Sequence, residues 1–378
     1  MKKRVRLSVL SPVFIGDEKG ERSPLEYYLE QKAYVYVISE GKLLRALKEK
    51  NRLKDFLTYL EQEDRPNMNR FFSQLGPQQS SVLRDATLRK IKTGVSNLSN
   101  LRLHMMNPMT GEPYIPGTSI KGSLRLALLY YLASKDTKNF VKRVEQAVEK
   151  EKNKKKAGKG IDTDYFQRYK IVKDNRSDGN PRNDILRMLK VSDAFVRIQS
   201  RTDYISEVYQ VKVISLNNDN GGYHFSRAGN REINIYVEAI QPGMRFEFDI
   251  DIDEFLENIF KSCGFTGKMN EQLMQALGLK YGNLLDEERS FFEKAGLKAM
   301  VNYCDMLKKS GANFRLGWGS GMLNTTAAML LPGEVRRKIR GRYFKPRNNV
   351  IFPQSRKVVV SGNGSVAHMI GWCKLEFV

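Results

Sequence analysis

Residues 231–252 read REINIYVEAIQPGMRFEFDIDI, and their alternation of polar and apolar side chains indicates the class of the fold. The runs 231–240 and 244–252 each show the period of two that is typical of a half-buried β-strand. The QPG between them, at 241–243, is a turn sequence and predicts a hairpin. This stretch therefore predicts antiparallel β-structure.

The rest of the chain mixes strand and helix patterns without regular β–α–β alternation. Further strand patterns occur near 3–10, 33–38, 98–105, 192–199 and 207–216, and in GWCKLEFV at 371–378. Helical spacing occurs at about 41–75, after a cap at Thr118 or Ser119, and from 253 onward, with the longest helix expected at about 286–309. The order predicts an α+β fold built on antiparallel sheet. We expect a core over residues 1–250 with helical insertions at about 40–95 and 135–187, followed by a helix-and-strand half over 251–378.

Composition limits the class of protein. The 378 residues carry a net charge of +22, and no apolar run approaches the roughly 20 residues of a membrane helix. The N-terminus lacks a secretory signal, and Cys263, Cys304 and Cys373 are too far apart for a CxxC zinc site or a disulfide framework. These features predict a soluble, cytoplasmic protein that binds a polyanion rather than a membrane.

The positive charge is concentrated in two clusters. Residues 150–159 carry six lysines and one acid, without aromatic residues, and are expected to form a solvated loop. Residues 334–357 carry nine basic side chains and one acid, interleaved with Tyr343, Phe344 and Phe352. Arginine binds phosphate bidentately and aromatic rings stack on unpaired bases, so nucleic acid is the favoured ligand. The candidate contacts are Arg336, Arg337, Arg340, Arg342, Lys345 and Arg347, and the alternative is a basic face around core aromatics.

Two glycine-containing motifs could approach a ligand with their backbone. Residues 114–129, YIPGTSIKGSLRLALL, predict a turn into a helix whose free N–H groups suit a phosphate, although a plain capped helix start is the favoured interpretation of this motif alone. Residues 315–321, RLGWGSG, have glycines at alternate positions but match neither a Walker loop nor a dinucleotide fingerprint. On these residues alone, a tight turn and a nucleic-acid contact are both open.

Together the motifs resemble the RAMP superfamily of CRISPR RNA-binding proteins. SPVFIGDEKGERSPLEY at 11–27, the motif at 114–129, and FRLGWGSGMLNTT at 314–326 occur in the family's order, and FPQSRK at 352–357 precedes GWCKLEF at 371–377. Within the superfamily the pattern is most similar to the fifth subunits of Csm (type III-A) effector complexes. Many relatives have histidine in the first loop, where this chain has Phe14, so a role for that imidazole is in doubt here.

The resemblance implies an RNA-recognition-like (ferredoxin-like) antiparallel core with helical insertions and a C-terminal half that carries a glycine-rich loop. It implies a subunit that caps the backbone filament at the 3′ side of the guide RNA and supports guide maturation. The implied partners are guide RNA, other Csm subunits and host nucleases that trim the guide. The RNA contacts implied by position are Gly16, Gly117, Ser119, Lys121, Gly122, Arg125, Arg315, Gly317, Gly319 and Gly321.

Catalysis is not expected from these residues. The histidines, His104, His224 and His368, are isolated in sequence, and the acidic run Asp249, Asp251, Asp253 and Glu254 is better explained as a polar strand face and a helix cap. We therefore expect no catalytic centre, cofactor or metal. The alternatives are a RAMP-type endoribonuclease that uses His224 or His104, and a sibling subunit of the type III-B Cmr complex.

Overall fold

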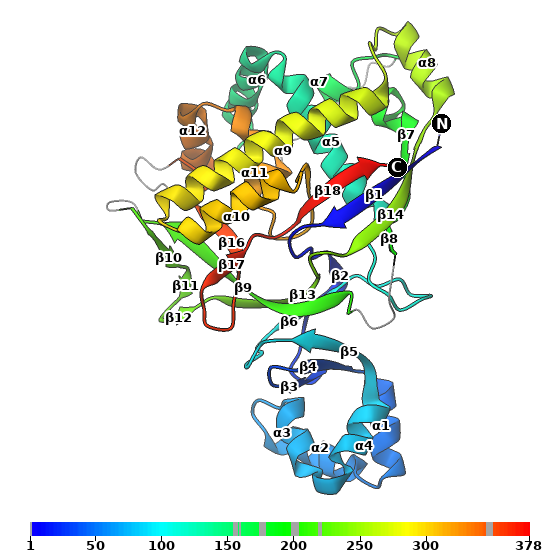
Figure 1. Cartoon of the computed structure of the whole chain (residues 1–378), viewed down its shortest axis with the longest axis vertical. Helices are drawn as coiled ribbons and strands as arrows, with labels where there is room; N and C mark the ends of the chain where they lie inside the picture. The colour runs from blue at the N-terminus through cyan, green and yellow to red at the C-terminus, as the bar shows by residue number, and fades with distance from the viewer. Residues whose placement is uncertain are drawn as a thin grey trace.

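The computed structural model describes residues 2–153, 158, 160–173, 179–197, 204–217, 221–344 and 351–378. It contains two large β-sheets with helices packed around them, and a small helical lobe at the lower end of the molecule in Figure 1. The mixed α+β class expected from the sequence is confirmed. In the described ranges, no helix is long and apolar enough to cross a membrane.

The six-stranded sheet contains strands from both ends of the chain, and we call it the terminal sheet. Its order is β15-β18-β1-β14-β7, with β8 also paired to β14, and every pairing is antiparallel. The strands are β1 (Lys2–Val9), β7 (Leu189–Val191), β8 (Phe195–Val196), β14 (Arg245–Ile252), β15 (Phe314–Arg315) and β18 (Trp372–Phe377). Strands on both sides of residue 250 therefore share one sheet, and the two termini lie close together (Figure 1).

The ten-stranded sheet, which we call the central sheet, has the path β2-β6-β13-β9-β5-β4-β3. Strands β10 and β16 also pair with β9, and β17 pairs with β16. The strands are β2 (Gly16–Arg22), β3 (Tyr27–Glu30), β4 (Tyr34–Ile38), β5 (Thr87–Thr93), β6 (Leu101–His104), β9 (Ser206–Leu216), β10 (Tyr223–Phe225), β13 (Asn234–Ile240), β16 (Ser355–Val360) and β17 (Val366–His368). A separate two-stranded ribbon joins β11 (Arg227–Ala228) and β12 (Arg231–Glu232).

The hairpin predicted at Gln241–Gly243 is wrong. Strands β13 and β14 exist as expected, but β13 pairs with β9 and β6 in the central sheet, whereas β14 pairs with β1 and β7 in the terminal sheet. The N–H of Gly243 donates to the carbonyl of Val9 at 2.8 Å, and the N–H of Val9 donates to the carbonyl of Met244 at 2.9 Å. The turn thus carries the chain from one sheet to the other, because long-range partners occupy both strand edges.

Helices α5 (Gly117–Ser134), α9 (Met269–Lys294) and α10 (Lys298–Lys309) form the main helical layer, in which α9 packs against both others. The single helix expected at 286–309 is wrong. It is interrupted at Gly296, which has φ +71°, and the longest helix, α9, begins earlier, at Met269. The acidic run behaves as expected: Asp253 accepts a hydrogen bond from the N–H of Leu256 at 3.2 Å and caps α8 (Glu254–Ser262).

The remaining helices lie in the insertions and after the glycine-rich loop. In the first insertion, α1 (Glu40–Glu49), α2 (Leu53–Gln62), α3 (Met68–Gln74) and α4 (Gln79–Ala86) enclose a small core of their own. The second insertion contains α6 (Thr137–Lys150) and α7 (Thr163–Phe166). The chain then adds α11 (Met322–Thr325) and α12 (Gly333–Tyr343). Within the lysine tract, residues 154–157 and 159 lie outside the described residues, so the loop expected there stays a prediction.

Candidate nucleic-acid interface

The glycine-rich loop, residues 315–321, lies where the first loop of the chain meets the C-terminal strand. The backbone N–H of Trp318 donates to the carbonyl oxygen of Phe14 at 2.8 Å. The N–H of Leu316 donates to the carbonyl of Gly371 at 3.0 Å, and the N–H of Gly371 donates to that of Pro12 at 2.9 Å. Three motifs that are far apart in sequence are thus joined by backbone hydrogen bonds.

Close packing explains two of the glycines. Gly317 has φ +83°, and a Cβ there would lie 2.5 Å from the carbonyl oxygen of Phe14. Gly319 has φ +86°, and its Cβ would lie 2.9 Å from the Ile370 side chain. Gly321 has the same φ as Gly317 but nothing within 4 Å of a Cβ. The first two positions therefore need glycine for both conformation and space, and Gly321 needs it for conformation alone.

The loop presents a half-buried indole with two cations over it. The Trp318 ring packs edge-to-face on Phe14, with 5.7 Å between centroids. The Arg102 guanidinium lies 5.4 Å from the indole centroid, and the Lys357 ammonium lies 4.6 Å from it. We call Trp318, Arg102 and Lys357 the glycine-loop surface. The three side chains come from the loop, from β6 and from β16, so only the folded chain assembles them.

The electrostatics of this surface suit an anion. Burial and the neighbouring charge of Arg102 lower the pKa of Lys357. Arg102 pairs with Glu21 at 2.5 Å, but Lys357 has no carboxylate partner among the residues that the structure describes. A phosphate beside Lys357 would relieve the repulsion between the two cations, and the indole offers a plane on which a base can stack.

Local sequence does not distinguish Arg102 or Lys357 as contacts, and Trp318 stands out only as part of its motif. Lys357 ends the basic cluster 334–357 and directly follows Arg356 in FPQSRK, but nothing local separates it from the other basic residues of that cluster. Arg102 lies in the expected strand at 98–105, where nothing in the local pattern distinguishes it from other exposed strand residues.

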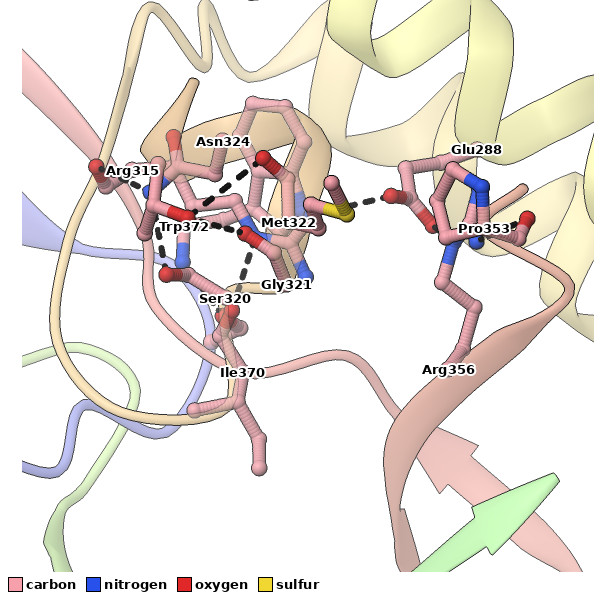
Figure 2. Close-up of polar contacts among 12 residues, drawn as sticks. Glu288, Arg315, Ser320, Gly321, Met322, Asn324, Pro353, Arg356, Ile370 and Trp372 are labelled. Carbon is pink, nitrogen blue, oxygen red and sulfur yellow. Dashed lines mark hydrogen bonds and ion pairs between the residues drawn. The ribbon is translucent and has the colours of Figure 1, made fainter. Parts of the chain in front are cut away.

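A buried ion-pair cluster holds the glycine-loop surface in place. Glu288 of α9 accepts from Arg315 at 3.2 Å and from Arg356 at 2.7 Å (Figure 2). Arg315 also donates to the carbonyl of Ile370 at 2.9 Å, and its side chain is 2% exposed. Burial raises the pKa of Glu288, but the two guanidinium groups outweigh it and hold that pKa below its ordinary value. Glu288 thus fixes the residues at the start of the loop and next to Lys357.

This position conflicts with an RNA contact for Arg315. Its guanidinium is enclosed and its donors are directed at protein acceptors, so reaching RNA would require leaving a carboxylate unpaired in the core. The geometry gives Arg315 a positioning role instead.

The N-terminal end of α5 binds a carboxylate of the same chain instead of presenting free N–H groups to a ligand. Pro116 is the N-cap residue and no side chain of the turn caps the helix, so the cap expected at Thr118 or Ser119 is wrong. Instead, the N–H of Gly117 donates to the Asp193 carboxylate at 2.7 Å. A Cβ at Gly117 would lie 2.5 Å from the carbonyl oxygen of Val191, which explains the glycine. The helix end that could have met a phosphate already holds an anion.

The two basic residues of this motif are also engaged internally. Lys121 donates to the carbonyl of Leu189 at 2.6 Å. Arg125 pairs with Asp162 at 2.8 Å and with Asp184 at 2.7 Å. Ser119 is half-buried, and Gly122 is exposed with nothing within 4 Å of a Cβ. Gly16 pairs with His104 at the start of β2, near the Phe14 ring.

The basic cluster divides between internal contacts and exposed side chains. Arg336 donates to the carbonyls of Leu331 and Met329, and Arg342 donates to the carbonyls of Glu151 and Glu149 at the end of α6. Helix α12 is thereby docked on α6. Arg337 is exposed and Arg340 is half-buried, while Lys345 and Arg347 lie outside the described residues.

The histidines do not converge. His104 is buried, with Nδ1 3.3 Å from the N–H of Ile15 and Nε2 3.0 Å from the carbonyl of Tyr114, and burial lowers its pKa. His224 is exposed on β10, where its Nδ1 lies 2.7 Å from the amide oxygen of Asn217. Over the ranges that the structure describes, no three His, Cys, Asp or Glu side chains gather as a metal site would require.

A buried lysine lies beside the glycine-rich loop. Lys280 of α9 is fully buried and donates to the carbonyl of Asn324 at 2.5 Å, and burial lowers its pKa to about 7. The unfolded chain keeps this proton up to a pH of about 10.4, whereas the folded chain loses it near 7, so stability rises with pH between these values.

Replacing Lys280 with methionine should remove this pH dependence. We expect the free energy of unfolding of the wild type to gain about 2 kcal/mol relative to Lys280→Met between pH 7 and 9, measured by urea denaturation. Lys294→Met, an exposed position on the same helix, is the control and should keep the wild-type profile. Parallel profiles for wild type and Lys280→Met would refute a neutral buried lysine.

The chain is similar to CRISPR proteins over nearly its whole length. It is 22% identical to the CRISPR system Cms protein Csm5 of Methanocaldococcus jannaschii, with 99% of this chain and 88% of that protein covered. Its fold is similar to a chain of a Csm–crRNA–target RNA ternary complex from a type III-A CRISPR-Cas system, with a TM-score of 0.72, 23% identity and 100% of both chains covered. It is also similar to Csm5 of T. onnurineus, with a TM-score of 0.68, 21% identity and 98% and 99% covered.

A family model described as the RAMP superfamily matches residues 6–321, which include the first loop, the start of α5 and the glycine-rich loop. The resemblance inferred from the three motifs is therefore confirmed, and this chain belongs to the RAMP superfamily.

Proposed function

We propose that this protein is the Csm5-type subunit of a type III-A CRISPR (Csm) complex and binds the guide RNA there. The observation that carries the proposal is the similarity to Csm5 proteins over 99% and 98% of the chain. The glycine-loop surface supports it, because an indole under two cations can stack a base and hold a phosphate.

The terminal sheet supports a ferredoxin-like, RNA-recognition-type core. Six elements follow one another along the chain in the order β–α–β–β–α–β: β1, α5, β7, β14, α9 and β18. In the sheet, the four strands have the order β18-β1-β14-β7, and each pair of neighbours is antiparallel. That is the strand arrangement of the split β–α–β fold. The glycine-rich loop follows β15 and enters α11, between this core and the central sheet.

We further propose that the subunit caps the backbone filament at the 3′ side of the guide and supports guide maturation without cutting RNA itself. Both ring nitrogens of His104 are engaged within the core, and His224 lies apart on an exposed strand, which favours a binding role over general acid–base cleavage. Other Csm subunits are the proposed protein partners, and outside nucleases would trim the RNA end that this subunit leaves exposed.

The proposed contacts within the glycine-loop surface are Trp318, Lys357 and Arg102. Among the contacts predicted from sequence, five that are exposed or half-buried remain proposals: Ser119, Gly122, Gly321, Arg337 and Arg340. Gly117 and Arg315 are buried, and the side chains of Lys121, Arg125, Arg336 and Arg342 bind protein groups. We propose that these residues, with Gly16, Gly317 and Gly319, shape the backbone that presents the surface. Sequence specificity should be low, because phosphate contacts and stacking position RNA without reading its bases.

Trp318→Ala should weaken binding of single-stranded guide RNA about 5- to 150-fold, because stacking on an aromatic ring contributes about 1–3 kcal/mol per base. Lys357→Gln should flatten the plot of log affinity against log salt concentration by about 0.7, the value for one phosphate contact on a single strand. Fluorescence anisotropy over a salt series, with a labelled 3′ fragment of the guide, measures both effects.

Matched controls separate contact loss from general damage. Phe255→Ala removes an exposed ring on α8, Lys309→Gln removes an exposed charge on α10, and both should bind as the wild type does. Trp318→Phe keeps a stacking ring and should restore most of the affinity. If Trp318→Ala folds normally and binds with unchanged affinity and salt slope, the glycine-loop surface is not the RNA site. Cleavage of repeat RNA lost in His224→Ala would contradict the non-catalytic role.

A further inference from the structure

A second aromatic and basic surface lies on the central sheet, away from the glycine-rich loop. Tyr34 and Tyr36 of β4 lie beside Lys90 and Lys92 of β5, in register, and Tyr204 reaches over from the segment before β9. We call these five residues the tyrosine–lysine face. None of them belongs to a motif that resembles the RAMP family, and β5 follows directly from the helical lobe.

The rings form a connected group that the helical lobe does not cover completely. The Tyr34 centroid lies 6.0 Å from that of Tyr204 and 6.4 Å from that of Tyr36. The hydroxyl of Tyr204 donates to that of Tyr34 at 3.3 Å, and Tyr204 remains 43% exposed. Tyr36 packs toward Tyr28 at the edge of the lobe, whereas Tyr34 and Tyr204 lie beyond it.

The cations of this face are available to an anion. The Lys90 ammonium lies 3.5 Å from the Tyr34 centroid and 5.2 Å from the Tyr36 centroid. Over the described ranges of the chain, neither Lys90 nor Lys92 forms an ion pair with a carboxylate. The nearby acids are Glu30, which accepts from the Tyr36 hydroxyl at 2.8 Å, and the half-buried Glu207 of β9.

Strand register places the tyrosine–lysine face and the glycine-loop surface on the same face of the central sheet. Lys92 is in register with Glu207, and Lys357 is in register with Val213, at positions of β9 that are six residues apart. Side chains an even number of residues apart point to the same side of a strand, and six residues span about 20 Å. On that face Val211 and Tyr209 of β9 pack with Phe14 and Ile370, so an RNA strand from Trp318 would pass over this cover, in the direction of β9, to reach Tyr204 and Lys92.

We propose that the tyrosine–lysine face is a second single-stranded RNA site, which receives the RNA beyond the segment held by the glycine-loop surface. This inference rests on the proposed function. The rings would stack unpaired bases, and Lys90 and Lys92 would hold the adjoining phosphates. Such a site uses β5, at the end of the first insertion, together with β4, which precedes the insertion, to lengthen the RNA footprint of the RAMP core.

The test uses the full chain and oligouridylates of two lengths, about 6 and about 20 nucleotides. The shorter lies within the footprint of one single-strand-binding module, about 4–16 nucleotides, and the longer exceeds it. The variant Tyr204→Ala/Lys92→Gln changes exposed side chains and should keep the wild-type Tm. We expect it to bind the long RNA at least about 5-fold more weakly than the wild type, and the short RNA equally well. The control Tyr131→Ala/Lys135→Gln removes another lysine–tyrosine pair, 4.2 Å apart on and next to α5, and should change neither affinity.

Crosslinking of 4-thiouridine-substituted long RNA locates the contact directly, and should label the peptide that contains Tyr204 in the wild type. If the wild type binds both RNAs but the double variant loses no affinity and the label lies elsewhere, this inference fails and the proposed function stands. If the wild type binds neither RNA, both fail. If the double variant binds RNA normally but no longer captures the other Csm subunits, the face belongs to a protein partner and the RNA site is refuted.

Discussion

Glu288→Ala should lower the free energy of unfolding by about 3–5 kcal/mol, because it leaves the buried Arg315 and Arg356 without a counter-charge. The two guanidinium groups would remain enclosed, since Arg315 stacks on Trp372 and Arg356 stacks on Phe291. Thermal or chemical denaturation measures the loss. Glu288→Gln should be intermediate, because its amide oxygen can still accept one of the hydrogen bonds.

The same variant should also weaken RNA binding. Arg315 opens the loop that carries Trp318, and Arg356 precedes Lys357 on β16, so the cluster positions two members of the glycine-loop surface. Glu287→Ala is the matched control: its side chain is the exposed neighbour on α9, and its removal should change stability by less than about 0.5 kcal/mol. A Glu288→Ala variant as stable as Glu287→Ala would mean that the arginines find other partners.

Gly317→Ala should destabilise the protein by about 2–5 kcal/mol, the sum of a left-handed backbone cost and an overlap with the carbonyl oxygen of Phe14. Gly321→Ala has φ +83° and ψ 167°, a region that only glycine enters readily, but no atom lies within 4 Å of its Cβ, so it should cost about 1–3 kcal/mol. Only Gly317→Ala adds an overlap between the glycine-rich loop and the first loop, so it should be the more destabilising variant.

RNA binding should separate the two variants as well. Gly317→Ala must push Trp318 away from Phe14, because the N–H of Trp318 is hydrogen-bonded to the carbonyl that the new Cβ would meet. We expect weaker guide RNA binding for Gly317→Ala at a temperature where it is still folded, and a smaller loss for Gly321→Ala, whose proposed contact is made by its backbone and which leaves Trp318 in place. Equal stability and equal affinity for both variants would contradict a close-packed junction of the two loops.

Local sequence patterns were sufficient for most elements. The alternation in 207–216, 231–240 and 244–252 predicted β9, β13 and β14, because a strand with one buried face shows that face in its own sequence. The motifs in their order also identified the superfamily, and the charge counts pointed to a polyanion. These properties depend on neighbouring residues or on sums over the chain.

Local patterns gave wrong predictions where a residue or strand from a distant part of the chain pairs with the same strand edge or the same polar group. The turn at Gln241–Gly243 looks like a hairpin, yet β1 and β9 attract its two strands into different sheets. The helix start at Gly117 looks open to phosphate, yet Asp193 occupies it from 76 residues away. In both cases the partner lies far away in the sequence, so the local sequence does not reveal it.

The arginines show this division most clearly. Sequence alone determined that the chain is strongly basic, α+β and RAMP-like, and it identified the glycine-rich loop as a candidate RNA contact. Only the tertiary structure decided that Arg315 is buried against Glu288 while Arg102 and Lys357 stand over Trp318. Whether a charge is available to RNA depends on how the chain's own carboxylates meet it. Glu288 encloses Arg315 in the core from 27 positions away, whereas Glu21 pairs with Arg102 at the surface and Lys357 has no carboxylate partner among the described residues.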